Sequence, residues 1–160
     1  MKHKDDNTLI GTSASNESMI NSITLKKPYK IISYLLKKAK FIKNFNKFPN
    51  PHIRTSSFLI KGQILLDYMI NRKINNKEDT WKIESGKDSL TNYFKIKKFN
   101  FYIVNSDGHK FDNKQWKLSK TFNYLDQSKS IISDKHTRKY LSLNEKDKYE
   151  VQIKTWGKSL

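Results

Sequence analysis

The sequence predicts a mainly β protein with one helix near its N-terminus, folded as a small curled sheet or an open barrel. Two observations predict this class. Apolar residues alternate with a period of two in several segments, which is typical of half-buried strands. The chain of 160 residues also contains only two alanines, although alanine favours helices more than any other residue. A chain of this length fits one domain with its own core.

Residues 1–27 are expected to form a disordered polar tail, and residues 28–160 a single basic domain. Serine, threonine and asparagine dominate the tail, so it cannot bury enough apolar surface to offset the entropy lost on ordering. Within the domain, residues 28–48 are expected to form a basic helix, because apolar side chains recur there at helical spacing. These side chains are Ile32, Leu35, Leu36, Ala39 and Ile42. We expect this stripe to cover the core; the alternative is a helix that lies on a membrane surface.

Alternation predicts the strands that follow. A long strand is expected over 58–70, where Gly62 would allow the bend that a curled sheet needs. A shorter strand is expected over 80–84, and another over 92–104. Asp107-Gly108 then favours a tight hairpin, with a return strand that begins within 109–112 and resumes over 116–122. Residues 126–147 are expected to be mostly loop, and the last strand to span 149–156.

The most informative segment is 92–104, which holds five aromatic rings and three lysines in thirteen residues. On a strand, both faces of this segment would mix rings with polar or cationic groups. Such a surface suits single-stranded nucleic acid, because bases stack on rings while lysines neutralise the phosphates. The alternative is an ordinary half-buried strand. An open barrel of the oligonucleotide-binding type is the simplest arrangement for these strands.

The charge of the chain favours the same partner. Its formal net charge is +17, and residues 26–73 hold twelve basic side chains and a single acid. A field this positive attracts polyanions, so a nucleic acid or an anionic membrane surface is the natural counterpart. An AT-rich genome explains the abundance of lysine, asparagine and isoleucine, but not the shortage of acids. Only three of the basic residues are arginine, which disfavours sequence-specific reading of duplex DNA.

The sequence therefore predicts non-enzymatic binding of nucleic acid, most simply single-stranded DNA or RNA. The expected stacking residues are Tyr93, Phe99, Phe101 and Trp116. The expected phosphate contacts are Lys95, Lys97, Lys98, Lys114 and Lys117. A second hypothesis is a structural component of a replication, plasmid-partition or ribonucleoprotein complex, with other proteins of that complex as partners. In that case the tail and the basic 28–48 segment would make the main contacts.

A metal-dependent nuclease is the third hypothesis. Asp112-Asn113-Lys114 has the spacing of an acid and a lysine at such centres, and Asp88 or Asp107 could supply a second carboxylate. The tripeptide is expected by chance in a chain this rich in lysine and aspartate. No catalytic residue, metal site or cofactor is otherwise predicted, because the four histidines are isolated and no phosphate-binding glycine loop is present.

The expected location is intracellular and cytoplasmic. The chain has no cysteine, which excludes a disulfide scaffold and thiolate metal sites. Its polar start is unlike a secretory signal, and no apolar run reaches membrane-spanning length.

Overall fold

The computed structural model describes residues 7–25 and 27–158, and it is predominantly helical. About 45% of the described residues are in helices and 13% are in strands. The described strands form one open sheet of four strands and one ribbon of two, so no closed barrel is present among them. The prediction of a mainly β fold, as a curled sheet or an open barrel of the oligonucleotide-binding type, is therefore wrong.

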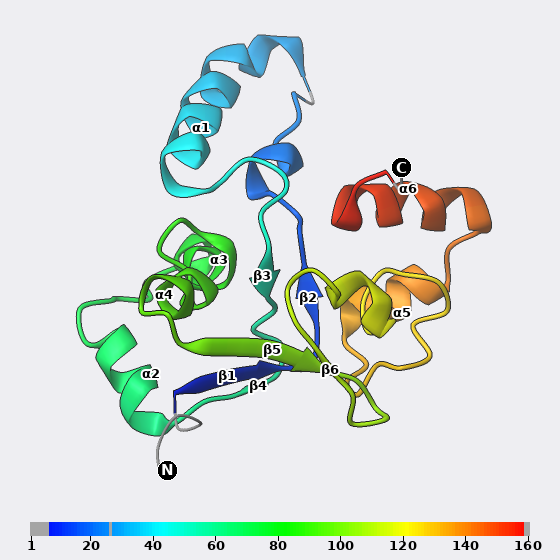
Figure 1. Ribbon diagram of the computed structural model, residues 1–160. Coiled ribbons are helices and arrows are strands. Elements are labelled where there is room, and N and C mark those ends of the chain that lie inside the picture. Colours follow the sequence, from blue (N-terminus) through cyan, green and yellow to red (C-terminus); the bar gives the residue numbers. More distant parts are fainter. Residues whose placement is uncertain (1–6, 26, 159–160) are drawn as a thin grey trace.

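Pairs of short strands are separated by runs of helices along the chain (Figure 1). The strands are β1 (Thr8–Gly11), β2 (Ala14–Ser15), β3 (His52–Ile53), β4 (Phe58–Leu59), β5 (Asn100–Val104) and β6 (Lys110–Phe111). The α-helices are α1 (Ile31–Asn44), α2 (Gly62–Met69), α3 (Lys77–Ser85), α4 (Leu90–Ile96), α5 (Lys135–Leu141) and α6 (Glu145–Trp156). Three short 3-10 helices complete the set: η1 (Met19–Ser22), η2 (Pro28–Lys30) and η3 (Trp116–Ser119).

The larger sheet has the strand order β4-β1-β5-β6. The central pair, β1 and β5, is parallel, and both outer pairs are antiparallel. Part of the segment expected to be a tail thus forms a central strand, because Leu9 is completely buried between neighbouring strands and helices. Residues 1–6 and 26 of that segment lie outside the described residues. The second sheet pairs β2 with β3 and places Ser15 opposite His52.

The long strand predicted over 58–70 is short β4 followed by α2. Its apolar residues also match the helical period: Ile64 and Tyr68, four residues apart, are buried on one face. Leu65 and Met69, also four apart, pack against the same core. Gly62 is the first residue of α2 rather than a bend in a strand. The mixed apolar composition of both strand faces was therefore a sign of a helix.

The predicted strand over 80–84 lies inside α3, which begins after Asn76. The Asn76 side chain accepts hydrogen bonds from the backbone N–H groups of Glu78 and Asp79, as an N-cap does. The predicted strand over 149–156 lies inside α6, where Asn144 has the same role towards Asp147. The return strand expected over 116–122 contains η3, and α5 falls in the expected loop. The Asp107-Gly108 hairpin is confirmed, because β5 and β6 pair across it.

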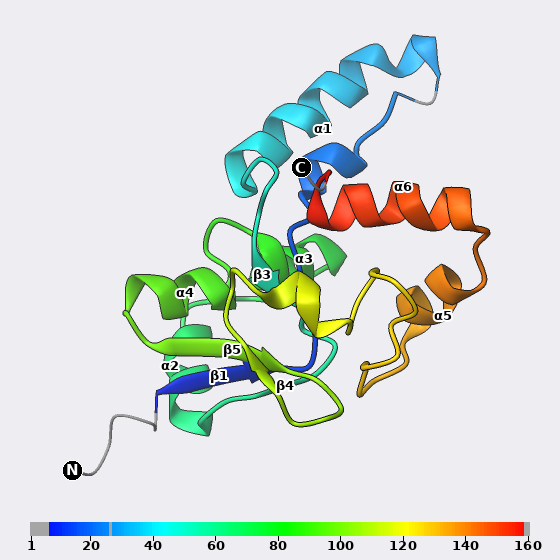
Figure 2. The same ribbon diagram turned by 45° about the vertical axis from the view of Figure 1, so that its right-hand side comes forward.

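A helix does lie within 28–48, but its apolar stripe does not cover the core. Of the α1 side chains, only Phe41 is buried. Phe41 packs on Phe45 and Trp81, with ring centroids 5.1 and 6.4 Å apart. This contact attaches the C-terminal half of α1 to the body, and the rest of the helix projects from it (Figures 1 and 2).

Candidate nucleic-acid interface

A hollow at the N-terminal end of β5 brings together three of the predicted binding residues. Tyr93 and Phe99 contribute half-buried rings, and Lys97 lies at the edge. The hollow has a volume of about 300 Å³, and α2 forms its other wall. We call it the α2–α4 hollow; its described lining is Asn7, Lys61, Gln63, Ile64, Asp67, Tyr93, Lys97 and Phe99.

The predicted strand over 92–104 divides into a helix and a strand, and the division creates this hollow. Ser89 caps α4 by accepting a hydrogen bond from the backbone of Asn92, and Leu90 and Phe94, four residues apart, are buried. The helix ends at Ile96, and two residues later Lys98 has a φ of 56°, in the left-handed region. The Phe99 N–H then donates to the Phe94 carbonyl at 2.9 Å, which closes the helix end. The chain turns sharply there and enters β5.

Neighbouring rings fix the two aromatic side chains of the hollow. Tyr93 meets Tyr68 edge to face at 5.3 Å, and Phe99 meets Phe94 in the same way at 5.6 Å. Tyr68 is itself fully buried, and its hydroxyl donates to the Asp88 carbonyl at 2.8 Å. Burial raises the pKa of Tyr68 to about 12, so this donor keeps its proton. The open faces of Tyr93 and Phe99 are therefore held on a rigid support.

The rim of the hollow is basic. Three exposed lysines follow one another at the end of α4, namely Lys95, Lys97 and Lys98, and we call them the basic rim; of these, Lys97 is in the described lining of the hollow. The Lys97 ammonium lies 5.9 Å from the centroid of the Tyr93 ring, where it is attracted to the ring face. Asp67 is the acid in the described lining, and it accepts a hydrogen bond from Gln63 at 2.8 Å. The hollow thus combines two aromatic rings with lysines, and its described lining adds one carboxylate, Asp67, and two amides, Asn7 and Gln63.

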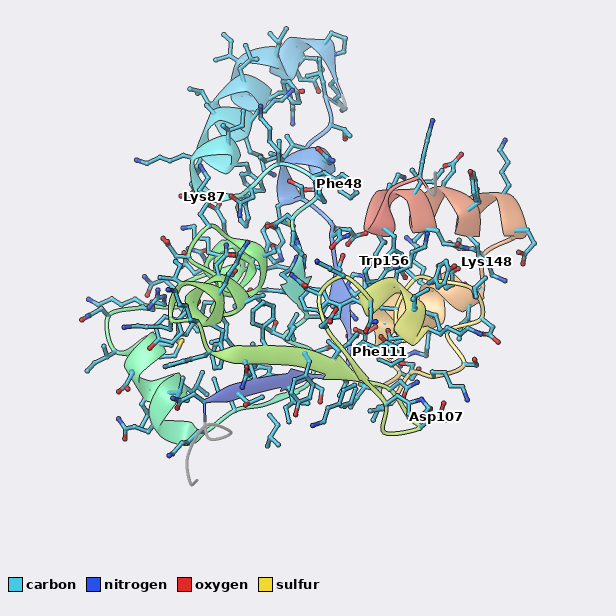
Figure 3. The ribbon with its side chains drawn as sticks, in the orientation of Figure 1. Phe48, Lys87, Asp107, Phe111, Lys148 and Trp156 are labelled. Carbon is cyan, nitrogen blue, oxygen red and sulfur yellow. The ribbon has the colours of Figure 1, made fainter. Side chains whose placement is uncertain are left out.

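The other predicted binding residues lie elsewhere. Trp116 is only 1% exposed and meets Phe101 edge to face at 6.2 Å, so both rings belong to the core packing and the stacking role predicted for them is not supported. Lys114 and Lys117 follow β6, and the Lys117 ammonium lies 4.9 Å from the Tyr124 ring centroid. The hairpin that precedes them carries Asp107 and Phe111, which are labelled in Figure 3. Neither Lys114 nor Lys117 belongs to the described lining of the hollow.

Lys61, Gln63 and Asp67 were missed by the sequence-based prediction. The predicted strand over 58–70 gave no reason to place these three residues beside Tyr93. In α2, Gln63 and Asp67 are four residues apart and share one helix face. The available signal was this helical spacing of Gln63 and Asp67.

A second hollow, of about 160 Å³, lies between the β2–β3 ribbon and α3. Its lining includes His52 and Arg54 from the β3 region, with Glu17 and Glu84 from either side. His52 is buried, and its Nδ1–H donates to the Asn50 carbonyl at 2.7 Å. Burial lowers the pKa of His52, and the nearby Glu84 and Glu17 carboxylates offset this only in part. The imidazole is therefore neutral at pH 7.

Most polar groups around His52 already have partners within the protein. Arg54 donates to the Asp134 carboxylate at 2.7 Å and stacks on Phe122, with 3.7 Å from guanidinium to ring centroid. Glu17 accepts from the Thr155 hydroxyl at 3.0 Å, and Glu84 accepts from the Thr55 N–H at 3.4 Å. This hollow joins distant segments, and its acids make it a poor site for phosphate.

Two acids of the nuclease hypothesis make local contacts with other groups. Asp112 accepts a hydrogen bond from the backbone of Lys114 in a surface turn, and Asp107 pairs with Lys129 at 3.0 Å. Among residues 7–25 and 27–158, no group of three or more histidine, aspartate or glutamate side chains could hold a metal ion.

Comparison with protein-family models finds no match, and comparison with curated proteins and with solved structures finds no significant match. The fold and the α2–α4 hollow are therefore described from this chain alone. In the described part of the chain, no helix is both long enough and apolar enough to cross a membrane.

Proposed function

We propose that the protein binds single-stranded nucleic acid, with bases stacked in the α2–α4 hollow and phosphates along its basic rim. One observation supports this most strongly: two supported rings, Tyr93 and Phe99, face the same hollow as Lys97. Each stacked base contributes about 1–3 kcal/mol, and every base has a face that can stack. The proposed role is binding without catalysis.

A single strand fits this site better than a duplex. Rings that are half-buried in a hollow meet a base only after that base has left its own stack, which costs least in a single strand. The rim offers lysine rather than arginine, so it provides point charges for the backbone and no forked donor for guanine. Both DNA and RNA offer bases for stacking and phosphates for the lysines. The proposed ligand class is therefore single-stranded nucleic acid of either kind.

The experiment compares the affinities for a single-stranded DNA, its duplex and the matching RNA over a salt series, using fluorescence anisotropy. A triple variant, Lys95→Gln, Lys97→Gln and Lys98→Gln, removes the rim charges. We expect its single-strand affinity to fall about ten-fold at low salt. The slope of log affinity against log salt should lessen by about 2, or about 0.7 for each lost phosphate contact.

The matched control is Lys135→Gln, Lys139→Gln and Lys146→Gln, which removes three exposed lysines from the α5 and α6 region. It lowers the net charge by the same amount but leaves the hollow intact. We expect a much smaller loss of affinity from the control. Equal losses from the two triple variants would mean that diffuse charge attracts the nucleic acid and that the hollow is not the site.

A further inference from the structure

The outer face of α1 is apolar and has no partner in the described protein. Five of its side chains expose between 44% and 72% of their surface: Ile31, Ile32, Leu35, Leu36 and Ile42. Ala39 is exposed among them. At 3.6 residues per turn, these six residues occupy about 140° of the helix circumference. A stripe of this width normally faces a core, and here it faces outward.

The opposite face of α1 already has neighbours. Phe41 packs into the body, while Ser33, Tyr34 and Lys37 face residues 22–25 across a hollow. At the C-terminal end, Lys87 donates to the Ile42 carbonyl at 2.9 Å and Lys40 pairs with Glu78 at 2.9 Å. The helix is thus attached by one side and one end, and its apolar stripe is turned away from these contacts.

The charge around this stripe selects the partner. Residues 27–47 contain seven lysines and no acid, and no acid occurs anywhere between Glu17 and Asp67. Lys38 lies at one edge of the stripe, and Lys40 and Lys43 lie towards the other. A second copy of the chain would bring the same positive charge to the interface, which disfavours self-association. A nucleic acid would neutralise the lysines but leave the apolar stripe in water.

We infer that α1 docks on an anionic lipid surface, with its apolar stripe at the boundary between headgroups and acyl chains. This requires a basic amphipathic helix that can lie flat. With 14 residues, α1 is about 21 Å long, and it projects from the body so that a plane can reach it (Figures 1 and 2). The exposed Lys43, beside the stripe, reaches the headgroups while its aliphatic stem stays near the acyl chains. The exposed Tyr29, which precedes the helix, is an amphipathic ring suited to the same boundary.

The test is sedimentation of the full chain with vesicles of phosphatidylcholine alone or mixed with phosphatidylglycerol. We expect binding only to the anionic vesicles. Replacing Ile32, Leu35 and Leu36 by serine should weaken this binding about ten-fold or more. The matched control replaces Leu66, Ile70 and Leu118 by serine; these side chains are 62–79% exposed and lie outside α1. The control should bind as the unmodified protein does.

A second readout follows insertion directly. The chain has no cysteine, so Leu35→Cys offers one attachment point for an environment-sensitive dye, and Leu66→Cys is its control. We expect the dye at position 35, and not at 66, to shift to the blue on anionic vesicles. Failure to bind these vesicles, or equal weakening by both serine triples, would overturn the inference. So would a dimer in solution that the α1 triple alone dissociates, because a second copy would then cover the stripe.

This inference stands independently of nucleic-acid binding. The α1 triple variant leaves the α2–α4 hollow unchanged, so its affinity for single-stranded DNA should equal that of the unmodified protein. Loss of both activities in this variant would contradict the assignment of lipid docking to α1 and of nucleic acid to the hollow.

Discussion

At the scale of single residues, His52 shows how polar groups hold the centre of the molecule together. Its Nδ1–H is directed to the Asn50 carbonyl, and the Asn50 amide donates to the Ser85 carbonyl at 2.7 Å. The backbone N–H of Asn50 also donates to the carbonyl of Asn16 at 2.9 Å. These bonds connect the segments before β3, after β2 and at the end of α3. A charged imidazole at this position would lose its hydration, and the nearby carboxylates would compensate for this loss only in part.

Stability should therefore fall in mild acid. Burial lowers the pKa of His52 below its ordinary value of 6.5, so on acidification the unfolded chain binds a proton before the folded protein does. The free energy of unfolding is highest above pH 6.5 and decreases from there down to the lowered pKa. One proton gives a slope of at most about 1.4 kcal/mol per pH unit.

Urea unfolding at pH 7.5 and pH 5.0 measures this slope. His52→Gln keeps a donor for the Asn50 carbonyl but cannot titrate, so the difference in stability between the two pH values should shrink in this variant. An unchanged difference would show that other groups cause the pH dependence.

At the scale of elements, β1 requires its glycine, Gly11, whereas α2 does not require Gly62. A Cβ atom on Gly11 would collide with Ile53 and approach Ile103, two buried side chains of the core. A Cβ on Gly62, the first residue of α2, would meet nothing within 4 Å. Gly11 thus permits β1 to pass close to β3, whereas Gly62 has no such role.

Gly11→Ala should destabilise the fold by about 1–3 kcal/mol, because the collision requires buried groups to move. Gly62→Ala should leave stability unchanged or raise it slightly, since alanine loses less entropy than glycine in a helix. Thermal or urea unfolding of the two variants measures both effects. A harmless Gly11→Ala would contradict the placement of β1 at the centre of the sheet.

Features that depend only on residues close together in the sequence could be predicted. The Asp107-Gly108 hairpin needs only a glycine with positive φ, and Gly108 has φ 78°. The helix within 28–48 needs only its apolar period. The predictions of strands over 80–84 and 149–156 were wrong. They rested on the alternation of a few apolar residues, whereas Asn76 and Asn144 just before these segments are helix N-caps, of α3 and α6.

The candidate site was predicted in part, for a physical reason. Rings and lysines can be counted from the sequence, but the side of each ring that meets protein depends on long-range packing. Trp116 belongs to η3, after the hairpin, and contacts Phe101, whereas Tyr93 contacts Tyr68 of α2. Only the second arrangement leaves an open hollow beside the ring. The apolar stripe of α1 was likewise visible, but its outward orientation was not.

At the scale of the whole molecule, the two proposed surfaces lie on different parts of the fold. The α2–α4 hollow is beside the N-terminal end of β5, and α1 projects at the top of Figure 1, above α3, whereas α2 lies at the lower left. The positive charge of the chain would attract both proposed partners, because each is a polyanion. The two proposed surfaces share no residue, so we expect lipid and a single strand to bind without competing.

The central claim is that bases enter the α2–α4 hollow. The most direct measurement is photo-crosslinking to a single-stranded DNA that contains 5-iodouracil, with the attachment point sequenced by mass spectrometry. We predict that the cross-links form at Tyr93 or Phe99 and disappear when an unlabelled single strand competes. Cross-links at Tyr102, at Tyr124 or on α1, with none at Tyr93 or Phe99, would contradict this account.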